Sequence, residues 1–244
     1  MKKVGTVKEI WIYPVKSMKG TPIESADMYW YGFRGDRRYA FVRSNDHSTF
    51  PWLTGREVPR IVQYQPEFTN SGNRKDSEIQ VTTPEGKIHT ISSTLLRQEL
   101  ATQYKKPVHL MQLNRGAFDA APISIITTGT IKRLSDVHGA DLDLRRFRIN
   151  LIIESDDPTP YIEGSWIDGS LVFGEAADAT AILPVRPIKR CVMVYIDPVT
   201  AEKDADVLKN VIKSRDNCLG TYAWPRTVGS IHVGDPIYHA ENNG

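Results

Sequence analysis

The stretch that decides the fold class is Val7-Lys8-Glu9-Ile10-Trp11-Ile12-Tyr13-Pro14. Apolar and polar residues largely alternate in it, and β-branched and aromatic side chains are frequent, so it is predicted as a strand that ends at Pro14. Similar segments recur at close spacing along the chain. Strands are predicted at residues 38–42, 60–64, 78–82, 87–91, 107–111, 123–126, 148–153 and 191–196, with two short ones around a Gly-Asp turn within residues 229–238.

The predicted helices are few. One covers residues 92–104, a second begins after Thr127 or Thr128, either of which can cap it, and a third lies between residues 201 and 214. The apolar stripe predicted for the first helix consists of Leu95, Leu96, Leu100 and Ala101. Many short strands with few helices indicate a β-rich α+β protein with barrel-like sheets.

Two connections have their own signals. The turn Thr83-Pro84-Glu85-Gly86 joins two predicted strands and is typical of a hairpin. Residues 70–76 are polar and are predicted to form a flexible loop. We expect a domain boundary between about residues 105 and 120, and the two halves are expected to pack together because no long linker separates them.

Composition excludes several classes of protein. The 244 residues are 40% hydrophobic and 25% charged, as in a globular protein, and the formal net charge of +2 gives no overall attraction to nucleic acid or to an anionic membrane. The two cysteines form neither a disulfide framework nor a CxxC pair. The N-terminus has no apolar segment typical of a signal peptide, and no run is long enough to span a membrane, so the cytoplasm is the expected location.

Two groups of cations in the first half of the sequence could bind an oxyanion. Lys16 and Ser17 directly follow the first predicted strand, and a cation, a hydroxyl and loop amides suit a phosphate, although a solvated turn is the plainer alternative. Arg37 lies in a basic, glycine-containing turn where Asp36 could orient a guanidinium, and Arg56 adds a further cation. Surface ion pairs are the alternative for this second group.

Two groups in the second half could contact a polar ligand or a metal. Arg148 and Asn150 are two residues apart on a predicted strand, so their side chains should share a face and require polar partners, either a ligand or an internal ion pair. Lys189 and Arg190 precede Cys191, and neighbouring cations favour the thiolate form, which binds soft metals or attacks electrophiles. A small buried cysteine is the alternative.

In their order and spacing, these segments resemble proteins of the MOSC superfamily, in which an N-terminal β-barrel domain precedes a MOSC domain. The segments similar to the N-terminal domain are Ile12-Tyr13-Pro14-Val15-Lys16-Ser17-Met18-Lys19-Gly20, Gly35-Asp36-Arg37-Arg38-Tyr39 and Thr54-Gly55-Arg56-Glu57. Those similar to the MOSC domain are Phe147-Arg148-Ile149-Asn150, Lys189-Arg190-Cys191, Asp197-Pro198 and Gly229-Ser230-Ile231-His232-Val233-Gly234-Asp235. The resemblance implies an N-terminal β-barrel-like domain at residues 1–105, packed on a MOSC β-barrel domain at residues 106–244.

The resemblance also implies a molybdenum cofactor bound between the two domains. By this comparison Cys191 is the metal ligand and the catalytic residue. The residues implied to hold the pterin and its phosphate are Lys16, Ser17, Arg37, Arg56, Thr127, Arg148, Asn150 and Arg190. A phosphate, a polar pterin and a soft metal would meet cations, amide or guanidinium groups and a thiolate, respectively.

Within the superfamily the pattern is most similar to the amidoxime-reducing components, which implies two-electron reduction of small N-hydroxylated compounds. The chain lacks the cysteines of an iron–sulfur domain, so the implied electron donor is a separate ferredoxin- or cytochrome-like protein. Pyridoxal phosphate binding is associated with the superfamily, but this chain has no pyridoxal-phosphate domain and is not expected to be a complete cofactor sulfurase.

Two other functions compete with the reductase. Cys191 could carry sulfur as a persulfide, or hand the cofactor on, in a protein that is not itself an enzyme. Alternatively, the arginines could bind a nucleotide or nucleic acid, which the small net charge and the missing basic-aromatic platform argue against. Bound metal would favour the reductase, whereas salt-sensitive binding without metal would favour the nucleotide-binding function.

Overall fold

The computed structural model describes residues 1–70 and 77–241. Its main feature is a barrel in which seven strands close on themselves, because β1 pairs both with β16 and with β11. The order around the eight-stranded sheet is β11-β10-β14-β13-β12-β16-β1-β2. The strands are β1 (Lys2–Ile12), β2 (Thr21–Ile23), β10 (Ile123–Thr127), β11 (Leu151–Ser155), β12 (Gly169–Phe173), β13 (Thr180–Lys189), β14 (Cys218–Thr227) and β16 (Pro236–Glu241).

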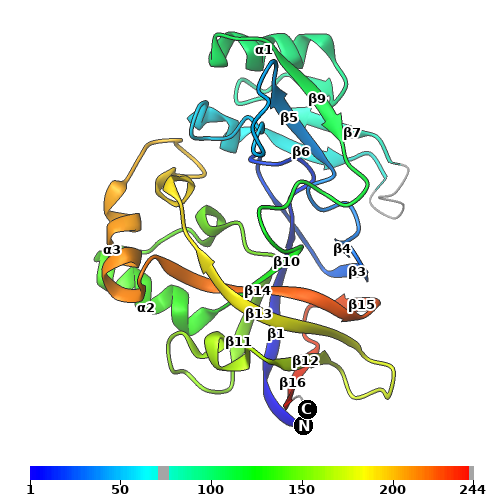
Figure 1. The fold of residues 1–244 in the computed structure, drawn as a ribbon, viewed down its shortest axis with the longest axis vertical. Helices are drawn as coiled ribbons and strands as arrows, with labels where there is room; N and C mark the ends of the chain where they lie inside the picture. Colours follow the sequence, from blue (N-terminus) through cyan, green and yellow to red (C-terminus); the bar gives the residue numbers. More distant parts are fainter. Residues whose placement is uncertain (71–76, 242–244) are drawn as a thin grey trace.

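Smaller sheets make up the rest of the molecule (Figure 1). Their strands are β3 (Ser25–Tyr29), β4 (Gly32–Phe33), β5 (Tyr39–Arg43), β6 (Gln65–Phe68), β7 (Ile79–Thr82), β8 (Ile88–Thr90), β9 (Val108–Gln112) and β15 (Gly229–His232). β5 pairs with β9, β6 to β8 form an antiparallel sheet, and β15 pairs with β3. The predicted fold class, a β-rich α+β protein with a barrel, is confirmed.

The strand that opens the sequence also supplies the barrel core. Val7, Ile10 and Ile12 are fully buried, although Ile10 comes three positions after Val7 and Ile12 comes only two positions after Ile10. The register of β1 against β11 shifts between Val7 and Glu9, which is a β-bulge. A bulge adds one residue to one strand, so it turns Ile10 and Ile12 to the same interior side as Val7.

The three predicted helices are confirmed as α1 (Thr94–Tyr104), α2 (Thr128–His138) and α3 (Ala205–Arg215). α1 is capped by Ser93 and α2 by Thr127, and each side chain accepts a hydrogen bond from a backbone N–H of the first turn. The stripe predicted for α1 is only partly correct. Leu96 and Leu100 are buried under the helix, whereas Leu95 is 64% exposed.

Most predicted strands are confirmed, including the hairpin of β7 and β8 around residues 83–86. Two are wrong. Residues 60–64 belong to a 3₁₀ helix (Pro59–Gln63), in which Pro59 occupies the first turn and needs no N–H partner. Residues 191–196 form the 3₁₀ helix η4 (Val192–Tyr195), with Cys191 at its N-cap. Short apolar runs do not distinguish a strand from a helical turn by period alone.

The strand predicted at residues 148–153 begins later, as β11 at Leu151. Arg148 instead ends the 3₁₀ helix η2 (Leu144–Phe147) in a left-handed conformation, with a φ angle of 52°. Arg148 and Asn150 therefore do not share a strand face, and that expectation is corrected. Of the predicted flexible loop at 70–76, residues 71–76 lie outside the described part of the chain.

The predicted division near residue 105 stays a prediction. β1 and β2 come from the first half of the chain, yet they belong to the same sheet as the strands after residue 122. The first half therefore contributes both its own small sheets and part of the barrel wall. None of the helices in residues 1–70 and 77–241 is long and apolar enough to cross a membrane.

The two adjacent leucines of α1 give a matched test of the packing. Leu96→Ala should lower the free energy of unfolding by about 2–5 kcal/mol, because Leu96 is fully buried. Leu95→Ala should change it by less than about 0.5 kcal/mol, because Leu95 projects into solvent. Urea unfolding of both variants measures the difference, and equal losses would contradict the placement of the helix.

Candidate functional site

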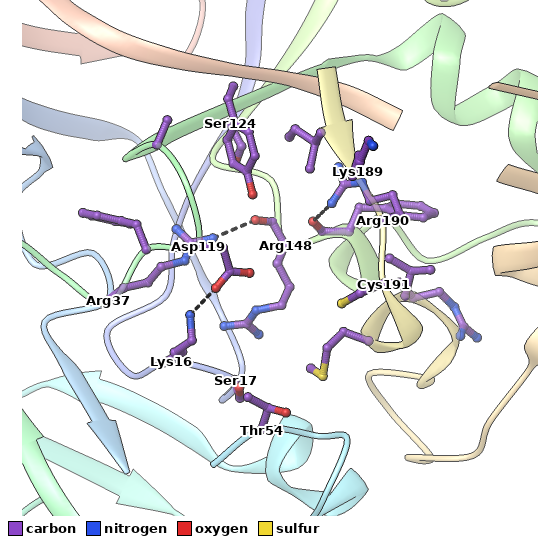
Figure 2. A pocket seen from close by; sticks show the side chains of 18 of the residues that line it. Lys16, Ser17, Arg37, Thr54, Asp119, Ser124, Arg148, Lys189, Arg190 and Cys191 are labelled. Carbon is purple, nitrogen blue, oxygen red and sulfur yellow. Dashed lines mark hydrogen bonds and ion pairs between the residues drawn. The ribbon is translucent and has the colours of Figure 1, made fainter. Parts of the chain in front are cut away.

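One large pocket lies where loops of the first half meet the barrel and η4 (Figure 2). It encloses about 820 Å³ of empty space, a volume that includes the open solvent at its mouth. Eight of the nine residues predicted from the sequence as site residues line it. They are Lys16, Ser17, Arg37, Arg56, Arg148, Asn150, Arg190 and Cys191.

Thr127 is the exception. It is buried, it caps α2, and its hydroxyl donates to the Glu163 carboxylate at 2.9 Å and contacts the Thr130 hydroxyl at 3.0 Å. Thr127 is not among the residues that line the pocket. Its proposed contact with a ligand thus has no support from its position.

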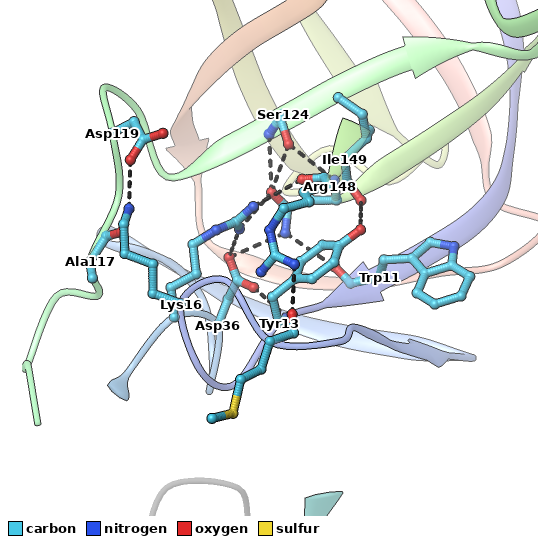
Figure 3. Close-up of polar contacts among 12 residues, drawn as sticks. Trp11, Tyr13, Lys16, Asp36, Ala117, Asp119, Ser124, Arg148 and Ile149 are labelled. Carbon is cyan, nitrogen blue, oxygen red and sulfur yellow. Dashed lines mark hydrogen bonds and ion pairs between the residues drawn. The ribbon is translucent and has the colours of Figure 1, made fainter. Parts of the chain in front are cut away.

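A buried carboxylate organises the floor of the pocket (Figure 3). The Asp36 side chain is 1% exposed, and it accepts hydrogen bonds from the Tyr13 backbone N–H at 2.7 Å and from Asn150 Nδ2 at 3.2 Å. It also forms an ion pair with Arg37. The role considered for Asp36 from the sequence, orienting a guanidinium, is confirmed by this contact. Burial of Arg37 would lower its pKa, but the Asp36 carboxylate outweighs this effect and holds the pKa of Arg37 above its ordinary value.

Asn150 connects this carboxylate to the barrel. Its Oδ1 accepts from the Ser124 hydroxyl at 2.9 Å and from Arg37 Nη1 at 3.3 Å, while its Nδ2 also donates to the Trp11 carbonyl at 3.1 Å. Asn150 thus bridges β1, Ser124 at the start of β10 and the turn that holds Arg37. Because both the oxygen and the nitrogen of its amide are hydrogen bonded to protein, Asn150 helps to hold Arg37 and Asp36 in position.

The Tyr13 ring supports two guanidiniums. Arg148 lies 4.3 Å and Arg37 4.9 Å from the ring centre, and the Tyr13 hydroxyl donates to the Ile149 carbonyl at 3.2 Å. Burial raises the pKa of Tyr13 to about 12. Gly20 leaves room for this ring, because a Cβ added there would lie 2.4 Å from a ring carbon.

Three pocket residues adopt a backbone conformation that residues other than glycine rarely use. Ser17, Arg37 and Arg148 have φ angles of 67°, 50° and 52°. The Arg37 guanidinium donates to the Arg148 carbonyl at 2.9 Å, and Arg148 Nη1 donates to the Met18 carbonyl at 2.6 Å. These contacts hold the turns in place, so strained backbone is concentrated at the pocket, as is common for binding sites.

Lys16 has an internal counter-ion. Its ammonium group donates to the Ala117 carbonyl at 2.7 Å and to the Asp119 carboxylate at 2.5 Å. Burial lowers the pKa of Lys16, and Asp119 opposes that shift. Burial would raise the pKa of Asp119, but the ion pair with Lys16 holds it below its ordinary value. Asp119 could not be recognised as a site residue from the sequence, since it lies in a connection without periodicity.

Two guanidiniums of the pocket have spare donors. Arg190 donates to the Leu219 carbonyl through Nε and to the Phe147 carbonyl through Nη1, both at 2.8 Å. Nη2 of Arg190 and Nη2 of Arg148 are buried without a hydrogen-bond partner. Burial lowers the pKa of each guanidinium to about 10, and for Arg148 the nearby Arg37 adds to this. Buried donors without partners are costly, so a bound acceptor would stabilise the pocket.

Cys191 lies on the side of the pocket away from Lys16 and Arg37 (Figure 2). Its thiol is free and partly exposed. The interaction with Cys191 is the main cause that raises the pKa of the Arg56 guanidinium. This interaction joins the first half of the chain to the second. Among the described residues, no three His, Cys, Asp or Glu side chains gather to form a metal site.

Charge is the dominant property of the pocket. Among the described residues, seven cationic side chains and one carboxylate, Asp119, line it. The cations are Lys16, Arg37, Arg56, Arg146, Arg148, Lys189 and Arg190. Such an excess, with spare guanidinium donors and a thiol, fits an anionic ligand that carries a soft metal. The predicted site residues besides Thr127 are thus brought together, while their individual roles remain proposals.

Comparison with protein-family models identifies the class of this chain. The model of the MOSC domain matches residues 106–238, and the model of the MOSC N-terminal beta barrel domain matches residues 4–122. The chain therefore belongs to the MOSC domain family. The resemblance inferred from the sequence is confirmed.

The individual relatives that the chain matches have low sequence identity to it. The chain is 24% identical to mitochondrial amidoxime reducing component 2 and to mitochondrial amidoxime-reducing component 1 of Homo sapiens, over 98% of this chain and 84% of each human chain. Among solved structures, the YUAD protein from Bacillus subtilis superposes with a TM-score of 0.50 at 12% identity, over 98% of this chain and 97% of that one. This last similarity shows a common fold.

The buried Asp36 carboxylate gives a test of the floor network. Asp36→Asn should lower the free energy of unfolding by about 3–5 kcal/mol, because it leaves buried guanidiniums without their counter-charge. Asp27→Asn is the matched control and should cost less than about 1 kcal/mol, since the Asp27–Arg34 pair is long and half-exposed. Urea unfolding compares the two variants, and similar losses would refute the central role of Asp36.

Proposed function

We propose that this chain is a molybdenum-cofactor-dependent oxidoreductase that reduces N-hydroxylated compounds with electrons from a separate protein. The observation that carries the proposal is the combination of a thiol with an excess of cations in one pocket, where Nη2 of Arg148 and Nη2 of Arg190 are buried without partners. The family membership and the amidoxime reduction for which the human relatives are named support the same reaction class.

The pocket residues fit the cofactor by their chemistry. Lys16, Arg37 and Arg148 would hold its phosphate, with Ser17 as an additional donor. The spare donors of Arg148 and Arg190 would meet acceptor atoms of the phosphate or the pterin. Asn150 would act mainly through Arg37 and Asp36, because its amide is already hydrogen bonded to protein.

Cys191 would provide the sulfur ligand to molybdenum. When bound, the molybdenum centre supplies the two-electron chemistry that protein side chains lack. Reduction of an N–OH group breaks the N–O bond, consumes two electrons and two protons, and releases water. The chain itself binds and orients, and Phe50 and Phe118 shield part of the pocket wall from water.

The electrons would come from a partner of the ferredoxin or cytochrome type. The two cysteines of the sequence are too few for the four thiolates that iron–sulfur clusters usually require. The cytoplasmic location and the absence of nucleic-acid or membrane partners stay predictions. Cys191 as a sulfur or cofactor carrier is the second candidate, and the partial exposure of its thiol favours keeping it.

The metal assignment can be tested with the two cysteines as a matched pair. The protein, purified from a host that makes the cofactor, should contain about one molybdenum and one pterin per chain, as should Cys218→Ala. Cys191→Ala should lose molybdenum or show an altered metal spectrum, and it should reduce N-hydroxylated substrates at least about 100-fold more slowly, since even residues beyond the ligands cost 10–100-fold.

Metal analysis, fluorescence of the oxidised pterin and turnover with a chemical reductant provide three separate readouts. A folded wild-type protein with neither molybdenum nor pterin would overturn the reductase proposal. Persulfide on Cys191 in that protein, and not on Cys218, would instead support the carrier.

A further inference from the structure

Most cations of the pocket are already bound to oxygen atoms of the protein. Lys16, Arg37, Arg148 and Arg190 have the carbonyl and carboxylate partners described above. Arg146 donates to the Tyr195 carbonyl at 3.1 Å and pairs with Asp197 at 2.6 Å. Within residues 1–70 and 77–241, the two remaining cations of the pocket, Arg56 and Lys189, have no such oxygen partner, and both residues are exposed.

The acids nearest to Arg56 are committed elsewhere. Asp119 is held by Lys16 at 2.5 Å. Glu57 accepts from the Thr54 backbone N–H and hydroxyl, both at 2.9 Å, and its other oxygen contacts Arg43 at 3.3 Å. Both acids act on Arg56 only through space. The guanidinium therefore keeps its capacity to pair with an anion.

The surroundings of Arg56 present it to the pocket. The turn that carries it is fixed by the Thr54–Glu57 contacts, and the Arg56 backbone N–H donates to the Thr54 hydroxyl at 3.2 Å. The guanidinium lies 5.5 Å from the centre of the Phe50 ring, and Cys191 is the main influence on its pKa. Arg56 thus has Cys191 as its main electrostatic neighbour, and Cys191 lies across the pocket from Lys16 and Arg37 (Figure 2).

We infer that Arg56 is a specificity residue for the substrate, and that this site takes N-hydroxylated compounds bearing a carboxylate or phosphate group. The inference rests on the proposed function, since that function places the cofactor anion with Lys16, Arg37 and Arg148. An anion on the substrate then meets the one arginine of the pocket that has no oxygen partner among the described residues. A planar guanidinium binds such groups through two parallel hydrogen bonds.

Binding of reaction products tests this without turnover. Benzamide and 4-carboxybenzamide are the products expected from N-hydroxybenzamide and its 4-carboxy derivative. The wild-type protein as purified should bind 4-carboxybenzamide about tenfold more tightly than benzamide, as expected for a hydrogen-bonded charge. The preference should disappear in Arg56→Gln and persist in reduced form in Arg56→Lys, which keeps the charge without the fork.

Arg97→Gln is the matched control, because it removes the same charge from an exposed position on α1 away from the pocket. It should retain the wild-type preference, and added salt should weaken that preference in both proteins. Calorimetry measures the affinities. Equal binding of the two amides by the wild type, or an unchanged preference in Arg56→Gln, would overturn the inference.

Turnover of the two N-hydroxy compounds separates this inference from the proposed function. Loaded protein is assayed with reduced methyl viologen, so no partner protein takes part. If neither compound is reduced, the reductase proposal fails, while the binding preference still decides the role of Arg56. If both are reduced with equal kcat/KM, and Arg56→Gln impairs turnover only with a protein donor, Arg56 belongs to a docking surface and the substrate inference is wrong.

Discussion

The pocket depends on one buried carboxylate. Asp36 is reached by a backbone N–H from the end of the first strand, by the side-chain amide that precedes β11, and by a guanidinium from its own turn. The most distant of these partners, Asn150, is 114 residues from Asp36 in the sequence. A single negative charge in the interior therefore fixes the position of two chain segments and stabilises several buried cations above it. Cationic groups would otherwise repel one another at such short range.

The arrangement separates two kinds of cation. The cations on the floor are held in place, because carbonyl and carboxylate oxygens of the protein accept hydrogen bonds from part of each cationic group. Their remaining donors would be available to a ligand. Arg56, at the mouth, is held by an aromatic ring and a sulfur. Under the proposed function, the anionic cofactor and the exchangeable substrate would need different partners, and the two kinds of cation would meet that difference.

Much of this could be predicted from the sequence, and the reasons differ between fold and site. Strands and helices with a full period, such as β1 and α2, follow from alternation, caps and apolar spacing. The short runs at 60–64 and 191–196 were predicted as strands but form 3₁₀ helices, because runs of five or six residues carry too little periodicity. The prediction that Arg148 and Asn150 share a strand face is wrong because Arg148 has a left-handed backbone conformation and the strand begins only at Leu151.

For the site, the cations and Cys191 could be found because they stand next to recognisable turns and because their order resembles a family. Asp119 and Tyr13 could not. Asp119 matters only through its contact with Lys16, 103 residues away, and Tyr13 looked like an ordinary strand residue. Partnerships of this kind arise from tertiary folding and leave no local pattern.

The closure of the barrel has a consequence for the order of events in the cell. β1 must pair with β16 as well as with β11, so the barrel is complete only after residues 236–241 have emerged from the ribosome. Lys16 follows β1 directly and Cys191 follows β13, so the two sides of the pocket meet only in the closed barrel. Pairing between distant segments is also slow to form. A ligand that touches both sides of this pocket can therefore bind only after the last strand of the barrel has been synthesised and paired.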